Sequence, residues 1–109
     1  MRPVIVKAYA SFYPATEDVL RSVESVLSGW FIEDAAGLKK DMLVISFEGD
    51  AFPDEEVIDA LKPFMREETR GKLDVMDLEA WTLRRWTFSG REANVNTVTL
   101  NKALDTSLM

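Results

Sequence analysis

Arginine and aromatic side chains gather in one stretch of the sequence, between residues 81 and 91. This combination is favoured at protein interfaces, and on a sheet surface it can also stack nucleic-acid bases. The alternative is that the tryptophans fill the core while the arginines pair with Glu79 and Glu92. The candidate interface residues in this stretch are Trp81, Arg84, Arg85, Trp86, Phe88 and Arg91.

A second group that could do chemistry is acidic. Carboxylate oxygens can bind Mg²⁺ or Ca²⁺, but the spacing here does not match a calcium-binding loop. Carboxylates also stabilise the positive end of a helix, and we expect these to do so while facing water. We therefore predict no metal site and no cofactor. The residues are Glu48, Asp50, Asp54, Glu55, Glu56 and Asp59.

Catalytic chemistry has few candidates in this chain. The sequence contains no histidine and no cysteine, which removes His-based general bases, Ser-His and Cys-His pairs, and Cys/His zinc sites. No phosphate-binding or dinucleotide fingerprint is present. The sequence favours a protein that is not an enzyme, and an enzyme working with carboxylates is the weakest of three alternatives.

The net charge of −6 argues against nucleic-acid binding, because attraction to phosphates is the main sequence-independent contribution to such binding. The acidic excess lies in residues 1–71, whereas residues 72–109 carry equal numbers of acidic and basic side chains. No apolar run approaches the length of a membrane span, and the N-terminus shows no secretory pattern. Together with the lack of cysteine, this predicts a soluble cytoplasmic protein.

The order of predicted elements is β-α-β-β-α-β followed by one extra strand. Strand, helix, hairpin, helix and long hairpin are expected over 3–12, 16–29, 30–47, 53–71 and 72–100, with the long hairpin folded at Ser89-Gly90-Arg91. Within the first hairpin, Asp34 to Gly37 is expected to form the turn. An alternative for 30–36 is an extension of the preceding helix. Pro63 is expected to kink or split the second helix.

This order predicts an α+β, ferredoxin-like sandwich, with two helices on one face of an antiparallel sheet and an extra C-terminal strand. We expect one domain over 1–101 and a short tail over 102–109. The expected core includes Val23, Val26, Leu43, Ile45, Leu61 and Phe64.

The last strand, Ala93 to Leu100, carries no charge and no proline over its whole length. Edge strands are normally protected by such residues, so this strand is suited to pairing with another chain. Val95 and Val98 complete the candidate interface. We predict a homodimer, or association with another protein, through the C-terminal hairpin. The alternative function is a small-molecule-binding regulatory domain of ferredoxin-like (ACT-like) type.

Overall fold

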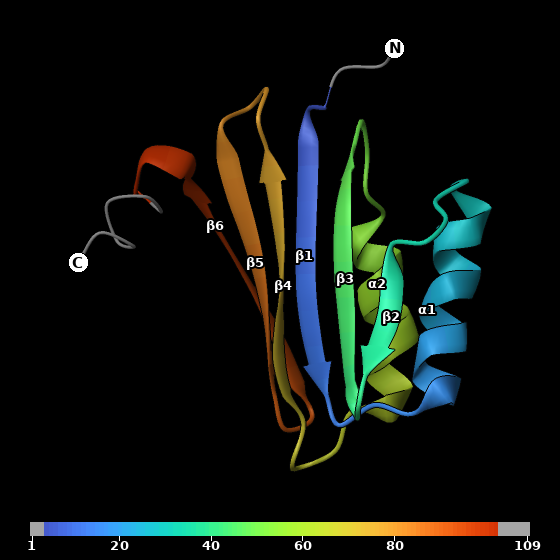
Figure 1. Ribbon diagram of the computed structural model, residues 1–109. Helices are drawn as coiled ribbons and strands as arrows, with labels where there is room; N and C mark the ends of the chain where they lie inside the picture. The colour runs from blue at the N-terminus through green and yellow to red at the C-terminus, as the bar shows by residue number, and fades with distance from the viewer. Residues whose placement is uncertain (1–3, 103–109) are drawn as a thin grey trace.

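The computed structural model describes residues 4–102 and shows an α+β fold in which one six-stranded antiparallel sheet carries helices on one face (Figure 1). The predicted α+β class is confirmed. In chain order the elements are β1 Val6–Tyr13, α1 Glu17–Gly29, β2 Ala36–Lys39, β3 Met42–Gly49, α2 Asp54–Leu61, the 3-10 helix η1 Lys62–Phe64, β4 Arg70–Asp77, β5 Thr82–Ser89 and β6 Glu92–Thr99.

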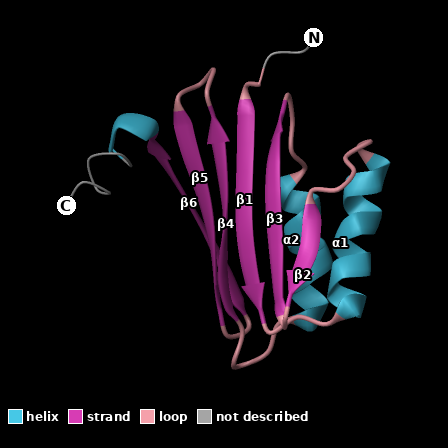
Figure 2. Cartoon of the chain, viewed as in Figure 1, coloured by secondary structure: helices cyan, strands magenta, loops and turns pink. Residues whose placement is uncertain are grey.

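The strands lie in the order β2-β3-β1-β4-β5-β6, and every neighbouring pair is antiparallel. The sheet therefore has two strands beyond the four of the predicted sandwich core. The helices cover the side of the sheet that holds β2, β3 and β1, whereas β5 and β6 extend past them (Figure 2). This overhang leaves both faces of the last hairpin partly open.

The core lies between the helices and the alternate residues of the central strands that face them. In α1, Val19, Val23 and Leu27 recur at helical spacing and are buried. On β1 the facing residues are Val6, Ala8, Ala10 and Phe12, and Phe12 packs edge-to-face on Phe88 of β5 with ring centroids 5.3 Å apart. Of the six expected core residues, Val23, Leu43, Ile45 and Leu61 are buried, and Val26 and Phe64 pack partly buried against them.

The prediction of a single strand over the first half of the long hairpin is wrong. Residues 72–88 contain two strands, β4 and β5, joined by a turn at residues 78–81. The Asp77 carboxylate accepts hydrogen bonds from the backbone N–H groups of Glu79 and Ala80, and Trp81 adopts a left-handed φ of 59°. The fold at Ser89-Gly90-Arg91 is where it was expected, between β5 and β6.

The first hairpin is present, but its turn is displaced from the predicted position. Asp34 to Gly37 does not form the turn, because β2 begins at Ala36 and pairs with β3. The chain reverses instead at Lys40-Asp41, where Lys40 takes a left-handed φ of 57°. Helix α1 includes Gly29, and the left-handed residue after it is Phe31, so residues 30–35 form a loop rather than a strand or a longer helix.

The split expected at Pro63 is present, since α2 changes at Lys62 into the 3-10 helix η1. The predicted helix over 53–71 is nevertheless too long, because residues 65–69 form a loop and β4 begins at Arg70. Residues 100–102 are helical, and the remainder of the predicted tail lies outside the described residues. Within residues 4–102 no helix has the length and apolar character to cross a membrane.

Candidate functional site

The candidate interface residues of β5 divide between the two faces of the sheet. Arg84 and Trp86 lie on the helix side, where both side chains donate to the same carboxylate oxygen of Asp54 at the start of α2. The distances from Asp54 Oδ2 are 2.9 Å to the Arg84 guanidinium and 3.0 Å to Trp86 Nε1. This contact ties the second helix to β5.

Arg85 lies on the opposite face and forms a bidentate ion pair with Asp74 of β4. Its Nε and Nη2 donate hydrogen bonds to the two carboxylate oxygens of Asp74 at 2.7 and 2.8 Å. These hydrogen bonds raise the pKa of Arg85. The two adjacent arginines are therefore held by Asp54 and Asp74, and not by Glu79 or Glu92.

The remaining candidates on β5 and its turns have different surroundings. Phe88 is in the core and has almost no surface to offer a partner. Trp81 is 44% exposed, and its Nε1 donates to the side-chain oxygen of Asn101 at 2.8 Å. Arg91 is exposed in the turn between β5 and β6. The structure thus does not gather the six arginine and aromatic residues into one patch.

Strand β6 forms one edge of the sheet (Figure 1). Val95 is 50% exposed and faces the helix side, whereas Val98 is half-buried on the other face. Most of the other side chains of β6 are exposed asparagines and threonines. Within residues 4–102, β6 pairs with β5 alone, and no strand lies on its outer side. The edge is thus open and uncharged over the seven residues that follow Glu92.

The acidic group serves more than one purpose. Glu55, Glu56 and Asp59 are exposed on α2, as expected for carboxylates near a helix start. Asp54 is instead buried, at 7% exposure, and binds Arg84 and Trp86. No three potential metal ligands converge anywhere in residues 4–102.

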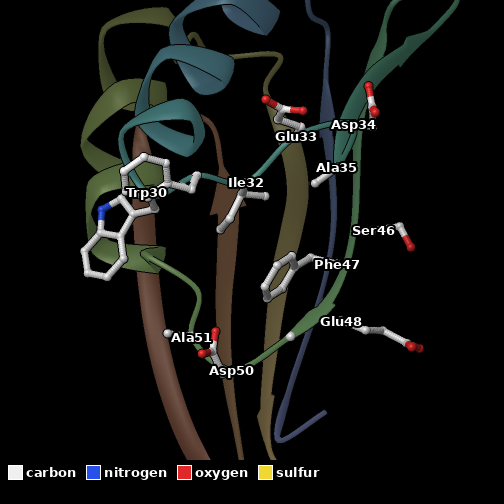
Figure 3. A pocket seen from close by; sticks show the side chains of 12 residues that line it. Trp30, Ile32, Glu33, Asp34, Ala35, Ser46, Phe47, Glu48, Asp50 and Ala51 are labelled. Atoms are coloured by element: carbon white, nitrogen blue, oxygen red, sulfur yellow. The ribbon is translucent and has the colours of Figure 1, made fainter. Parts of the chain in front are cut away.

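A groove that sequence reasoning missed runs between the α1–β2 loop and the end of β3 (Figure 3). It is formed by residues 30–35 and 46–51 and has a volume of about 770 Å³. The sequence signal for it is the apolar run Trp30-Phe31-Ile32, which falls in the first strand of the predicted hairpin over 30–47. In the structure these side chains belong to a surface loop.

Comparison with known proteins finds no matching family model, no matching curated protein and no matching solved structure. The functional argument for this chain therefore depends on its own surfaces.

Proposed function

We propose that this protein is a self-association module that forms a homodimer by pairing β6 of one copy with β6 of a second. The observation that carries the proposal is the open edge of β6, which has exposed side chains, no proline and no charge after Glu92. Unpaired backbone N–H and C=O groups on an edge are a template for another strand. An antiparallel pair also satisfies the two-fold symmetry that most homo-oligomers adopt.

The side chains of β6 suit such a joint. Residues directly opposite in an antiparallel pair lie on the same face of the sheet. Val95 and Thr97 would therefore lie opposite helix-side residues of the second copy, and Asn94 and Asn96 would lie opposite residues of the other face. These side chains neither repel one another nor require burial. The two six-stranded sheets would become one continuous sheet.

Sedimentation equilibrium of the purified protein across the micromolar range tests the proposal. The chain has a mass of 12.4 kDa, and the expected species has twice that mass. Val95→Lys combined with Thr97→Lys should weaken the dimer by about tenfold, because like charges placed in opposing pairs cost roughly 0.2–1 kcal/mol each. A protein that remains monomeric over this range would refute the proposal.

A matched control is available on the neighbouring strand. Thr87 and Ser89 are exposed on β5, which is not an edge. Thr87→Lys with Ser89→Lys adds the same charge without touching the joint and should leave the dimer intact. If both pairs of substitutions weaken the dimer equally, the effect is one of net charge and the interface lies elsewhere.

We further propose that β1 to β4, α1 and α2 form a ferredoxin-like unit, to which β5 and β6 are an extension. The order β2-β3-β1-β4 and the antiparallel pairing of these strands support this assignment. The proposed setting is the cytoplasm, because a chain without cysteine suits a reducing compartment.

A further inference from the structure

The groove between residues 30–35 and 46–51 exposes more aromatic surface than any other loop in the described part of the chain. Phe31 is 95% exposed, and the neighbouring Trp30 is 48% exposed. Large apolar side chains that stand together on a surface mark sites where another molecule binds. In Figure 3, Ile32 and Phe47 point into the hollow, so its floor is also apolar.

The aromatic side chains at this groove are supported by the fold. Trp30 Nε1 donates to a carboxylate oxygen of Glu56 on α2 at 2.9 Å, which fixes one edge of the indole ring. The ring of Phe47 packs against Phe52 with centroids 5.4 Å apart. The Trp30 and Phe47 rings are therefore held in place before a partner arrives, which lowers the entropic cost of binding against them.

The negative charge around the groove favours a positively charged partner. Four carboxylates line it, from Glu33, Asp34, Glu48 and Asp50, and no lysine or arginine does. Glu48 lies 3.6 Å from the Lys7 ammonium, whereas Glu33 and Asp34 have no ion-pair partner within residues 4–102. In the view of Figure 3, Glu33 lies above the hollow and Asp50 below it.

The C-terminal end of helix α1 adds to the negative electrostatic potential at the groove. The helix ends at Gly29, directly before the groove, and its last turn contains no basic residue. The C-terminal end of a helix carries a partial negative charge that attracts cations. The groove therefore combines an apolar floor with a negative rim, and a cationic group flanked by apolar groups complements both.

We infer that this groove binds a short peptide segment of a partner protein, in which basic side chains alternate with apolar ones. The apolar side chains would lie against Phe31, Ile32 and Phe47, and the basic ones would reach the carboxylates at the rim. A volume of about 770 Å³ is large enough for a few residues of an extended peptide. The groove is separated from β6 by β1, β4 and β5, so this binding goes beyond the proposed dimer and does not depend on it.

The test uses a fluorescein-labelled peptide of alternating leucine and arginine, titrated with the full chain and followed by fluorescence anisotropy. We expect saturable binding, and no binding of a peptide with glutamate in place of arginine. Backbone amide shifts on adding the unlabelled peptide should concentrate in residues 30–35 and 46–51. Equal binding of the two peptides, no binding of either, or shifts centred elsewhere would overturn the inference.

Substitutions separate a specific site from general attraction to an acidic protein. Phe31→Asn removes the ring but tolerates the left-handed backbone. Glu33→Lys with Asp34→Lys replaces two of the four rim carboxylates with ammonium groups, which cancels the formal charge of the rim. Each change should weaken peptide binding by about tenfold or more, as loss of a central contact does. The matched control, Glu67→Lys with Glu68→Lys, makes the same charge change at exposed positions away from the groove and should have little effect. A loss as large in the control would overturn the site.

The dimer variants distinguish this inference from the proposed function. Val95→Lys with Thr97→Lys should leave peptide affinity unchanged, whatever it does to the oligomeric state. If Phe31→Asn makes a dimeric protein monomeric, the groove is occupied by a second copy of this chain and the inferred peptide partner is wrong.

Discussion

Asp54 should contribute more to stability than any other carboxylate of the acidic group, because it is the buried member of the group and joins α2 to β5. Its carboxylate accepts from Trp86 Nε1 at 3.0 Å and from the Arg84 guanidinium at 2.9 Å. Replacement by alanine leaves the indole N–H without its partner and removes the ion pair. The hydrogen bond to a charged acceptor is worth about 1.5–3 kcal/mol. The Arg84 side chain is 45% exposed, so solvent screening reduces the ion pair to about 0–1 kcal/mol.

We therefore expect Asp54→Ala to lower the free energy of unfolding by about 2–4 kcal/mol. Urea unfolding followed by tryptophan fluorescence measures this loss, and a slope of about 2 kcal/mol per molar urea, in the middle of the typical range, turns it into a midpoint shift of about 1–2 M. Asp54→Asn retains an oxygen that can accept from Trp86 and loses only the charge, so it should cost about 1 kcal/mol.

The control for this prediction is Asp59→Ala. Asp59 lies on the same helix and pairs at 3.5 Å with Lys62, but its side chain is exposed. Its replacement should change stability by less than about 0.5 kcal/mol. If Asp54→Ala proves as mild as Asp59→Ala, or if the alanine and asparagine variants at 54 lose the same stability, the contact between α2 and β5 does not have the role argued here.

Two further changes test the packing of the sheet. Ile45→Ala in β3 should cost roughly 2–5 kcal/mol in urea unfolding, since Ile45 is buried in the core, and a variant that unfolds like the parent would contradict that placement. Gly71→Ala should lower the melting temperature markedly, because a Cβ at this position would collide with the carbonyl oxygen of Ser11 on the adjacent strand. The control Gly37→Ala has open space around it and should leave the melting temperature nearly unchanged. Equal effects of the two substitutions would show that β4 and β1 do not approach so closely.

The strongest periodic signals in the sequence were the most reliable. The predicted helix over 16–29 contains the stripe Val19, Val23 and Leu27, which is buried in α1. The predicted hairpin over 30–47 contains the apolar run from Met42 to Phe47, which forms most of β3 inside the sheet. In both segments the local pattern and the tertiary environment favour the same structure, so the pattern alone was sufficient.

The turn at residues 78–81 was missed because it contains no glycine, proline or asparagine. Its reversal depends on the Asp77 side chain and on a left-handed Trp81, and neither is a strong signal by itself. The length of the segment could have indicated this turn, since a single strand over 72–88 would be longer than strands usually are.

The separation of the arginine and aromatic residues could not be predicted either. Alternation along β5 places Arg84 and Trp86 on one face and Arg85 on the other, but it could not show that Asp54 at the start of α2 contacts the first of these faces. The partners Asp54 and Asp74 are, respectively, 30 and 11 residues away in the sequence. Likewise, the exposure of Phe31 follows from how the chain leaves α1 after Gly29, which the helical pattern does not show.

The two edges of the sheet differ in a way that limits how far any assembly can grow. At the edge opposite β6, the strand β2 has only four residues, Ala36–Lys39, and ends in a lysine. A short, charged edge is a poor template for a new strand. In a dimer joined through β6, both outer edges of the continuous sheet would be β2. Further copies would therefore have no suitable edge on which to add, and the repeated edge pairing that produces fibres would stop at the dimer. The same asymmetry allows β6 to remain uncharged without exposing the protein to open-ended aggregation.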